Sequence, residues 1–349
     1  MENDPFAPNL LARLPFPVRK VVLLRASRIG DFLCAVPALR ALRTRLPAAK
    51  ISMITVPLLQ EVAERLSSLD RVWPFPGFPG IAEQLFDARA TVHFFQQIQR
   101  EHFDLALQMQ GTGVYSNPFA LLLGARATAG FIRPGDTAGL LDAALPYPHH
   151  LHEIRCVLAL TEFLGAPSIG EELEFPLSAA DRAEAAALLA PWPQPWIGFH
   201  PSSRDQTRRW PLHNYLALAE QLLTSQGGTI FLLGDTEAVP AGQFLAQRLH
   251  KRCLDLTGSI SLLTSGALIE RLALLVTNDS GPAHIAYALH TPTATLFGVS
   301  ASPQTNGPLQ SGPFRLFSAP SRADQPGEIQ CIPVSQVFEA ADTLLREQR

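Results

Sequence analysis

The sequence has few charged residues and few cysteines, and both scarcities narrow what the protein can be. Charged residues make up 17% of the 349 residues, the net charge is −3, and no basic stripe occurs, so nucleic acid is not expected as a partner. Cys34, Cys156, Cys253 and Cys331 lie far apart and form no CxxC pair, which favours free thiols in a reducing compartment over a disulfide or metal site.

Long hydrophobic runs are also missing. No apolar run reaches the roughly 20 residues that a membrane-spanning helix needs. The first residues, MENDPFAPNLLARLPFP, are interrupted by prolines and do not resemble a secretory signal. We therefore expect a cytoplasmic protein, which could still touch the cytoplasmic face of the inner membrane.

Several common site motifs are absent. No GxGxxG follows the first predicted strand, no GxxxxGK[ST] occurs, and no GxSxG elbow is found. These absences argue against a nicotinamide dehydrogenase, a P-loop NTPase and a serine hydrolase of the elbow type. His149, His150 and His152 cluster, but a polar loop explains them better than a metal site does. No metal ligands and no cofactor are predicted.

What the sequence does contain is two runs of alternating strands and helices. Such alternation predicts an α/β protein with two doubly wound, Rossmann-like domains, residues 1–175 and 176–349. One alternative is that the last helix, about 334–346, packs back on the N-terminal domain. The predicted strands and helices include Lys20–Leu24, KISMITV, Phe103–Leu107, His152–Leu164, Trp196–Phe199, Leu212–Gln226, Thr229–Leu233, Leu274–Val276 and Thr293–Phe297.

Five loops follow predicted strands: RASRIGD, LQMQG, HPSSRDQTRRWP, GDTE and TNDSGPAH. In doubly wound sheets, ligands bind beyond the carboxyl ends of the strands. We therefore expect the functional residues in these loops.

The segment TNDSGPAH predicts an anion site. Asp279 or Ser280 is suited to cap the helix that follows, Gly281 allows close backbone approach, and Pro282 suits the first turn. Exposed amides and the helix dipole favour a phosphate there. His284 lies one turn in, on the ligand side. The alternative is a plain helix cap with a buried histidine.

The segment HPSSRDQTRRWP supplies hydroxyls and positive charge after a strand. Ser202 and Ser203 offer hydroxyls and amides, while Arg204, Arg208 and Arg209 form a basic cluster. Guanidinium groups pair with phosphate oxygens in bidentate geometry. A phosphate site is favoured over a solvated basic loop.

Carboxylates follow two other predicted strands. In GDTE, Glu237 could accept hydrogen bonds from ribose hydroxyls; Asp235 competes for this role, and a surface turn is the alternative. In RASRIGD, Asp31 sits where a helix begins, either as an N-cap or as the general base for an acceptor hydroxyl. Arg28, Gly30 and Gln110 are candidate acceptor-side residues.

Taken together, these segments resemble glycosyltransferase family 9, the ADP-heptose:lipopolysaccharide heptosyltransferases. The similar pieces are VVLLRASRIGDFLCAVPALRALRTRLPAAKI, FDLALQMQG, LLLGARATAGF, RRWP, LTGSISL, TNDSGPAHIAYAL, FGVSASPQTNGP and CIPVSQVFEAADTLL. The resemblance implies a GT-B fold, with two Rossmann-like domains facing a cleft, and an inverting transfer without an essential metal. RRWP departs from the more usual lysine-containing motif, and segments 74–100 and 132–152 carry no match.

The resemblance also implies roles for particular residues. Asp31 falls on the aspartate of the SxxGD motif and would be the base. Arg208 or Arg209 would bind the diphosphate. The donor loop would contain Asp279, Ser280, Gly281 and His284, and Glu237 falls near an acidic ribose-binding position.

The resulting hypothesis is transfer of a heptose or similar sugar from an ADP-sugar, ADP-heptose, to a hydroxyl of a lipopolysaccharide core or of another glycan or lipid-linked glycan. Two alternatives stay open. The first is a nucleotide-sugar epimerase on the same fold, and the second is a non-catalytic nucleotide-sugar-binding module.

Overall fold

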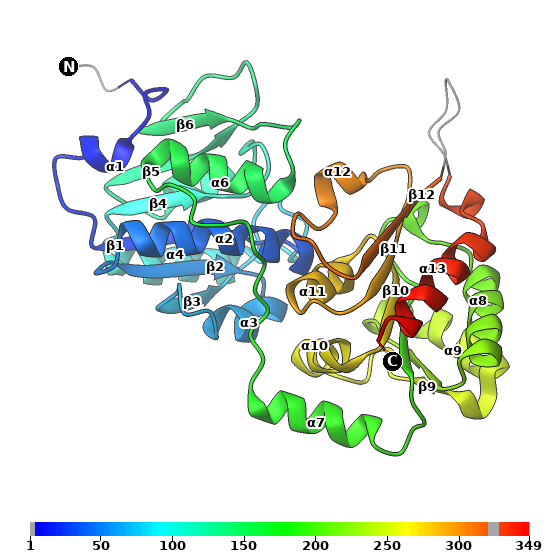
Figure 1. Cartoon of the computed structure of the whole chain (residues 1–349). Coiled ribbons are helices and arrows are strands. Elements are labelled where there is room, and N and C mark those ends of the chain that lie inside the picture. Colours follow the sequence, from blue (N-terminus) through cyan, green and yellow to red (C-terminus); the bar gives the residue numbers. More distant parts are fainter. Residues whose placement is uncertain (1–3, 320–327, 349) are drawn as a thin grey trace. The chain divides into compact units, whose positions relative to one another are not determined.

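The computed structural model describes residues 4–319 and 328–348. The chain divides into two compact units, Met1–Glu172 and Leu173–Arg349. Each contains one six-stranded sheet, and Figure 1 shows helices packed around both sheets. None of the helices among the described residues combines the length and apolar character that crossing a membrane requires.

The N-terminal unit is built on a parallel sheet with strand order β3-β2-β1-β4-β5-β6. The central strand β1 is KVVLL, and its last four side chains are buried, as expected for a strand covered on both faces. The strands are β1 Lys20–Leu24, β2 Lys50–Thr55, β3 Arg71–Pro74, β4 Leu105–Gln108, β5 Ala127–Ile132 and β6 Ala143–Pro146.

Helix α2 connects β1 to β2 and packs against α6. Helix α6 ends at Gly165, whose φ of 96° is the left-handed conformation that a C-cap glycine adopts. The helices are α1 Leu10–Arg13, α2 Ile29–Arg45, α3 Gln60–Glu64, α4 Ala88–Ile98, α5 Ser116–Leu122 and α6 Glu153–Leu164, with 3-10 turns η1 Pro57–Leu59 and η2 Gln99–Glu101.

The C-terminal unit repeats this architecture, with strand order β12-β11-β10-β7-β8-β9 and all strands parallel. Strands β10 and β7 lie at its centre. The strands are β7 Trp196–His200, β8 Thr229–Leu232, β9 Cys253–Asp255, β10 Leu274–Asn278, β11 Thr293–Phe297 and β12 Phe314–Ser318.

Helices of the C-terminal unit bury apolar faces on this sheet. The last helix, α13, places Val337, Ala341, Leu344 and Leu345 in the core of this unit, where it packs against α8, β10 and β11. The helices are α7 Ala179–Leu189, α8 Leu212–Ser225, α9 Val239–Leu249, α10 Leu262–Arg271, α11 Gly281–Ala288, α12 Pro303–Asn306 and α13 Val334–Arg346, with 3-10 turns η3 Gln206–Arg208, η4 Thr236–Ala238, η5 His250–Arg252 and η6 Ile329–Cys331.

The expected α/β alternation is confirmed, and the structure adds elements that the sequence pattern did not single out. The Ala-rich stretch at the start of the C-terminal unit contains α7, which begins with a capping box between Ser178 and Asp181 and packs against α10. Strands β3, β5 and β6 also escape the pattern, because their sequences RVWP, ATAGFI and AALP contain Pro, Ala or Gly, which weaken the strand signal.

Candidate functional site

The turn between β10 and α11 lies at the carboxyl edge of the C-terminal sheet. Asp279 follows β10, is only 3% exposed, and donates its backbone N–H to the carbonyl of Leu296 on β11 over 2.9 Å. Ser280 occupies the N-cap position of α11, but its hydroxyl does not cap the helix. Ser280 thus holds one of the two cap positions that the sequence allowed, but its hydroxyl contacts the Asn278 carbonyl and His200 rather than the amides of the helix.

His200, at the end of β7, organises the hydroxyls of this edge. Its Nδ1 lies 3.1 Å from Ser280 Oγ and 3.4 Å from Thr277 Oγ1, while its Nε2 lies 3.3 Å from Ser202 Oγ. Burial lowers the pKa of His200 to about 4, against the opposing effect of the Asp235 carboxylate. A neutral imidazole has one donor and one acceptor nitrogen, so the ring can link hydroxyls on both sides.

Asn278, the last residue of β10, holds the loop that follows β7. Its Oδ1 accepts the backbone N–H of Trp210 over 3.1 Å and the Tyr215 hydroxyl over 3.2 Å, and its Nδ2 donates to the Ser202 carbonyl over 3.3 Å. The side chain is fully buried, so these contacts satisfy an amide that would be costly to leave unpaired. The loop from Ser202 to Trp210 is thereby attached to the end of β10.

Arg208 is the basic residue of that loop that reaches the β10–α11 turn. Its Nη1 donates to Asp279 Oδ2 over 3.0 Å, its Nε to Ser300 Oγ over 2.9 Å, and its Nη2 to the Ser300 carbonyl over 2.9 Å. Arg209 is exposed and donates through Nε to the carbonyl of Ser203. The structure therefore separates the two arginines that the sequence left as alternatives.

Two neighbours fix where Arg208 lies. Asp205 caps η3 through Thr207 and accepts the Ser300 hydroxyl over 2.6 Å; these hydrogen bonds lower its pKa to about 2. Gly298 lies so close that a Cβ there would sit 2.5 Å from the Thr207 carbonyl oxygen and 2.9 Å from Arg208 Cα. The β11 loop and η3 are thus packed backbone against backbone.

The turn after β8 carries two carboxylates, Asp235 and Glu237. Asp235 caps η4 by accepting the backbone N–H of Glu237 over 3.0 Å, and both carboxylates are exposed. Asp235 also acts on the pKa of His200, which places it near the hydroxyl cluster. Glu237 stays a prediction for the ribose contact.

His284 lies in the first turn of α11 and is 6% exposed, with its ring 5.8 Å from that of Tyr287 in edge-to-face geometry. Gly281 is the first residue of the helix. Both residues therefore lie in the first turn of α11, and the His284 ring packs against Tyr287.

In the N-terminal unit, RASRIGD and LQMQG meet at the carboxyl ends of β1 and β4. Gln110 Oε1 accepts the backbone N–H of Ala26 over 2.9 Å. Arg28 is exposed at the N-cap of α2, Gly30 is buried, and Asp31 is the third residue of the helix and partly exposed. The alternative that Asp31 is the N-cap is therefore wrong, since Arg28 holds that position.

Sequence reasoning missed several of these residues. Arg25, Asn278, His200 and Ser300 all lie inside segments that the sequence singled out, but none was given a role, and each hydrogen-bonds with a residue distant in the chain. One signal could have found Ser300: it follows the predicted strand β11, whose carboxyl end lies at the same edge as that of β10.

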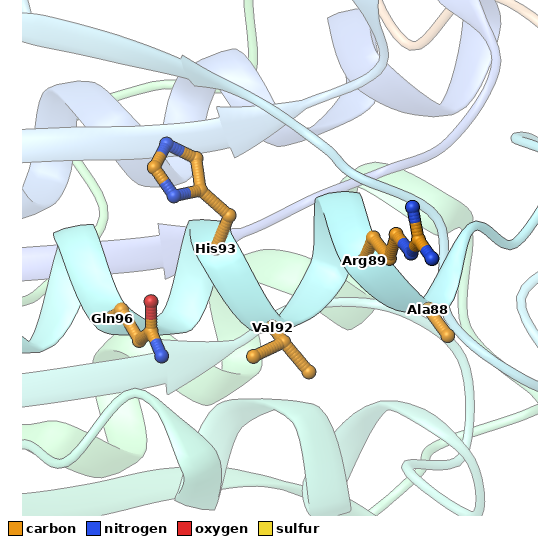
Figure 2. A pocket seen from close by; sticks show the side chains of 5 residues that line it. All are labelled: Ala88, Arg89, Val92, His93 and Gln96. Atoms are coloured by element: carbon orange, nitrogen blue, oxygen red, sulfur yellow. The ribbon is translucent and has the colours of Figure 1, made fainter.

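Helix α4 lies in the segment 74–100, where the sequence showed no resemblance to the family, although the family model described below covers it from residue 91, and a shallow hollow of about 360 Å³ lies beside this helix. Figure 2 shows that its lining residues all come from that one helix: Ala88, Arg89, Val92, His93 and Gln96. They combine a positive charge, polar groups and an apolar side chain on an open surface. Across the described residues, no three His, Cys, Asp or Glu side chains cluster as a metal site would require.

Relatives and solved structures agree with this architecture. Lipopolysaccharide heptosyltransferase 2 of Salmonella typhimurium is 26% identical over 306 residues, covering 83% of this chain and 85% of that protein. Lipooligosaccharide heptosyltransferase 2 of Haemophilus influenzae is 39% identical over 121 residues, covering 33% of this chain and 34% of that protein.

Among solved structures, a family 9 glycosyltransferase from Veillonella parvula superposes with a TM-score of 0.81 at 21% identity, covering 96% of this chain and 99% of its own. The structure of E. coli ADP-heptose lps heptosyltransferase II superposes with a TM-score of 0.77 at 21% identity, covering 94% of this chain and 99% of its own. The fold is that of the GT-B glycosyltransferases.

The family model described as glycosyltransferase family 9 (heptosyltransferase) matches residues 91–317. The chain belongs to this family of glycosyltransferases.

Proposed function

We propose that the protein transfers a heptose from ADP-heptose to a hydroxyl of a lipopolysaccharide core, with inversion at the anomeric carbon and without a metal ion. The observation that carries the proposal is the position of Arg208, held 3.0 Å from Asp279 beside the N-terminus of α11. A fixed guanidinium next to a helix N-terminus is a site for a diphosphate. The named donor of the E. coli structural neighbour, ADP-heptose, supports the choice of sugar nucleotide.

The C-terminal unit would bind this donor. Arg208 and the first amides of α11 stabilise the charge that develops on the departing diphosphate, and this electrostatic role replaces a metal ion. Ser202 and Ser280, both oriented by His200, offer hydroxyls to phosphate or sugar oxygens. Arg209, Ser203, Gly281 and His284 complete the proposed donor contacts, with Glu237 or Asp235 on the ribose.

The N-terminal unit would bind the acceptor, with Asp31 as general base. The carboxylate takes the proton from the acceptor hydroxyl as its oxygen attacks the anomeric carbon. The new carbon–oxygen bond forms while the bond to the diphosphate oxygen breaks, and ADP leaves. Arg28, Gly30 and Gln110 are the proposed acceptor-side residues. A lipid-linked acceptor would place the enzyme in the cytoplasm, in peripheral contact with the inner membrane.

The deciding experiment incubates the purified protein with ADP-heptose and lipopolysaccharide cores truncated at successive sugars, and follows ADP release and acceptor mass. Acceptor-dependent ADP release with a gain of one heptose supports transfer. Stereochemical change of ADP-heptose without acceptor would indicate an epimerase instead. Donor-induced thermal stabilisation with no turnover on any core would indicate a binding module.

The base is tested by Asp31→Asn. General base catalysis contributes about 10²- to 10⁴-fold, so kcat should fall within that range while the thermal shift caused by ADP-heptose is unchanged. Turnover of the Asn variant near that of the wild type would remove Asp31 from this role.

A further inference from the structure

A buried arginine, Arg25, links the end of β1 to α2, the helix that carries Asp31. Arg25 directly follows β1 and is 2% exposed. Its Nε and Nη2 donate to the Asp31 main-chain carbonyl over 3.1 and 2.7 Å, and its Nη1 donates to the Met109 carbonyl, just after β4. One guanidinium therefore ties the first turn of α2 to the ends of two central strands.

The other side of Arg25 is held by α6. Its Nη2 lies 2.8 Å from Glu153 Oε1 in the first turn of that helix, and Glu153 Oε2 accepts the Tyr147 hydroxyl over 2.7 Å. Burial opposes the charge of both partners; even so, the pKa of Arg25 is raised, by Glu153 and Asp31, and the pKa of Glu153 is lowered, by Arg25 and Tyr147. The pair is thus ionised and oriented by hydrogen bonds at both ends.

The geometry requires an arginine. A planar fork can reach two carbonyls and a carboxylate in fixed directions, whereas a lysine presents one compact charge on a flexible chain. Removing one partner of such a buried pair leaves the other uncompensated. Because two of the donors converge on the Asp31 carbonyl, they determine where the backbone of residue 31 sits, and so from where its carboxylate projects.

We infer that Arg25, held by Glu153 and Tyr147, is the positioning residue for Asp31. This inference rests on the proposed function, in which Asp31 is the base. Arg25 does not meet substrate; it acts by holding the first turn of α2 against the ends of β1 and β4. Misplacing a reacting group by about 1 Å can cost on the order of 10²-fold in rate.

The first test is Arg25→Lys, which keeps the charge and loses the fork. We expect kcat to fall about 10- to 100-fold with ADP-heptose and a lipopolysaccharide core, while the KM for ADP-heptose stays within about twofold, since the donor site is in the other unit. Arg43→Lys is a matched control, because Arg43, on the helix α2 that carries Asp31, also donates to two carbonyls, those of Ala49 and Ser68, and to the carboxylate of Asp70. It should lower the melting temperature without lowering kcat.

A double-mutant cycle separates positioning from general stability. If Arg25 acts through Asp31, Arg25→Lys should change the residual rate of Asp31→Asn by less than about twofold. If the double variant instead loses kcat by the product of the two single losses, Arg25 does not act through Asp31. That result would overturn the inference and leave the role of Asp31 intact. Near wild-type turnover of Asp31→Asn alone would instead overturn the proposed base.

A gentler variant covers the case in which Arg25→Lys fails to fold. Tyr147→Phe removes one hydrogen bond from Glu153 and leaves the ion pair. Tyr147→Phe should lower kcat by a smaller factor than Arg25→Lys does. This loss in kcat should again disappear in the Asp31→Asn background. An unchanged kcat in a folded Tyr147→Phe together with an unchanged kcat in Arg43→Lys would also count against the inference.

Discussion

Arg208 and Asp279 are 71 residues apart in the chain, and Nη1 of one lies 3.0 Å from Oδ2 of the other. Asp279 is 3% exposed and Arg208 is 28% exposed at its side chain, so the pair has one buried and one accessible end. The accessible guanidinium is the end that a phosphate could reach, and the buried carboxylate fixes its direction.

This pair makes the two arginines of RRWP unequal. Arg208→Ala should lower kcat/KM for ADP-heptose about 10²- to 10³-fold, the loss typical of removing one group that stabilises developing charge. The kcat/KM of Arg208→Lys should lie between those of the wild type and Arg208→Ala, because lysine keeps the positive charge but lacks the planar guanidinium. The kcat/KM of Arg209→Ala should stay within a few-fold of the wild-type value. Steady-state ADP release measures all three, and an Arg209→Ala loss as large as that of Arg208→Ala would contradict the assignment.

Gly298 tests whether the backbone position of Arg208 matters. A Cβ at residue 298 would meet the Thr207 carbonyl oxygen at 2.5 Å, so Gly298→Ala must displace η3. We expect a fall in kcat/KM of about 10-fold or more, with the secondary structure unchanged by circular dichroism. Val299→Ala, at the exposed neighbouring residue, is the control and should be neutral. Full activity of Gly298→Ala would show that the loop tolerates the shift.

His200 predicts a pH dependence of stability. Its pKa is lowered from an ordinary value of about 6.5 to about 4. Between these values the unfolded chain binds a proton that the folded protein does not, so stability falls as the pH drops below 6.5 and the loss is complete near pH 4. At pH 5 the loss relative to neutral pH is on the order of 2 kcal/mol.

Urea unfolding at pH 7.5, 6 and 5 measures this effect, with His200→Gln as the comparison. The His200→Gln variant should have a lower free energy of unfolding than the wild type at pH 7.5. Between pH 7.5 and 5, however, its free energy of unfolding should fall by less than that of the wild type. Asp205, whose pKa is about 2, loses its stabilising contribution only below the ordinary value of an aspartate, which lies outside this window. Parallel pH profiles for wild type and His200→Gln would exclude the histidine as the cause.

The two carboxylates after β8 can be separated by their different structural roles. Glu237→Gln removes charge from an exposed side chain and should raise the KM for ADP-heptose about 10-fold with little effect on kcat, as expected for a contact made equally in ground and transition states. Asp235→Asn should mainly weaken the cap of η4. If Asp235→Asn has the larger effect on KM in a protein of unchanged melting temperature, Asp235 is the ribose contact.

Much of the fold could be predicted because the strands are short, buried and apolar and alternate with amphipathic helices. Strands β1, β7, β10 and β11 lie where the sequence places them, and the loops after them form the carboxyl edges of their sheets. Strands such as RVWP and helices such as AADRAEAAALL could not be found this way, because their residues pack through neighbours that the local pattern does not contain.

The sequence by itself determined the architecture, the family and the loops that hold the site, since hydrophobic period and motif order are properties of the chain. Only the tertiary structure decided which arginine reaches Asp279, that the Ser280 hydroxyl turns to His200 rather than to its helix, and that Arg25 clamps the turn of Asp31. These contacts join residues that parallel strands bring to one sheet edge from distant positions. Side-chain direction there depends on backbone geometry, which no local pattern encodes.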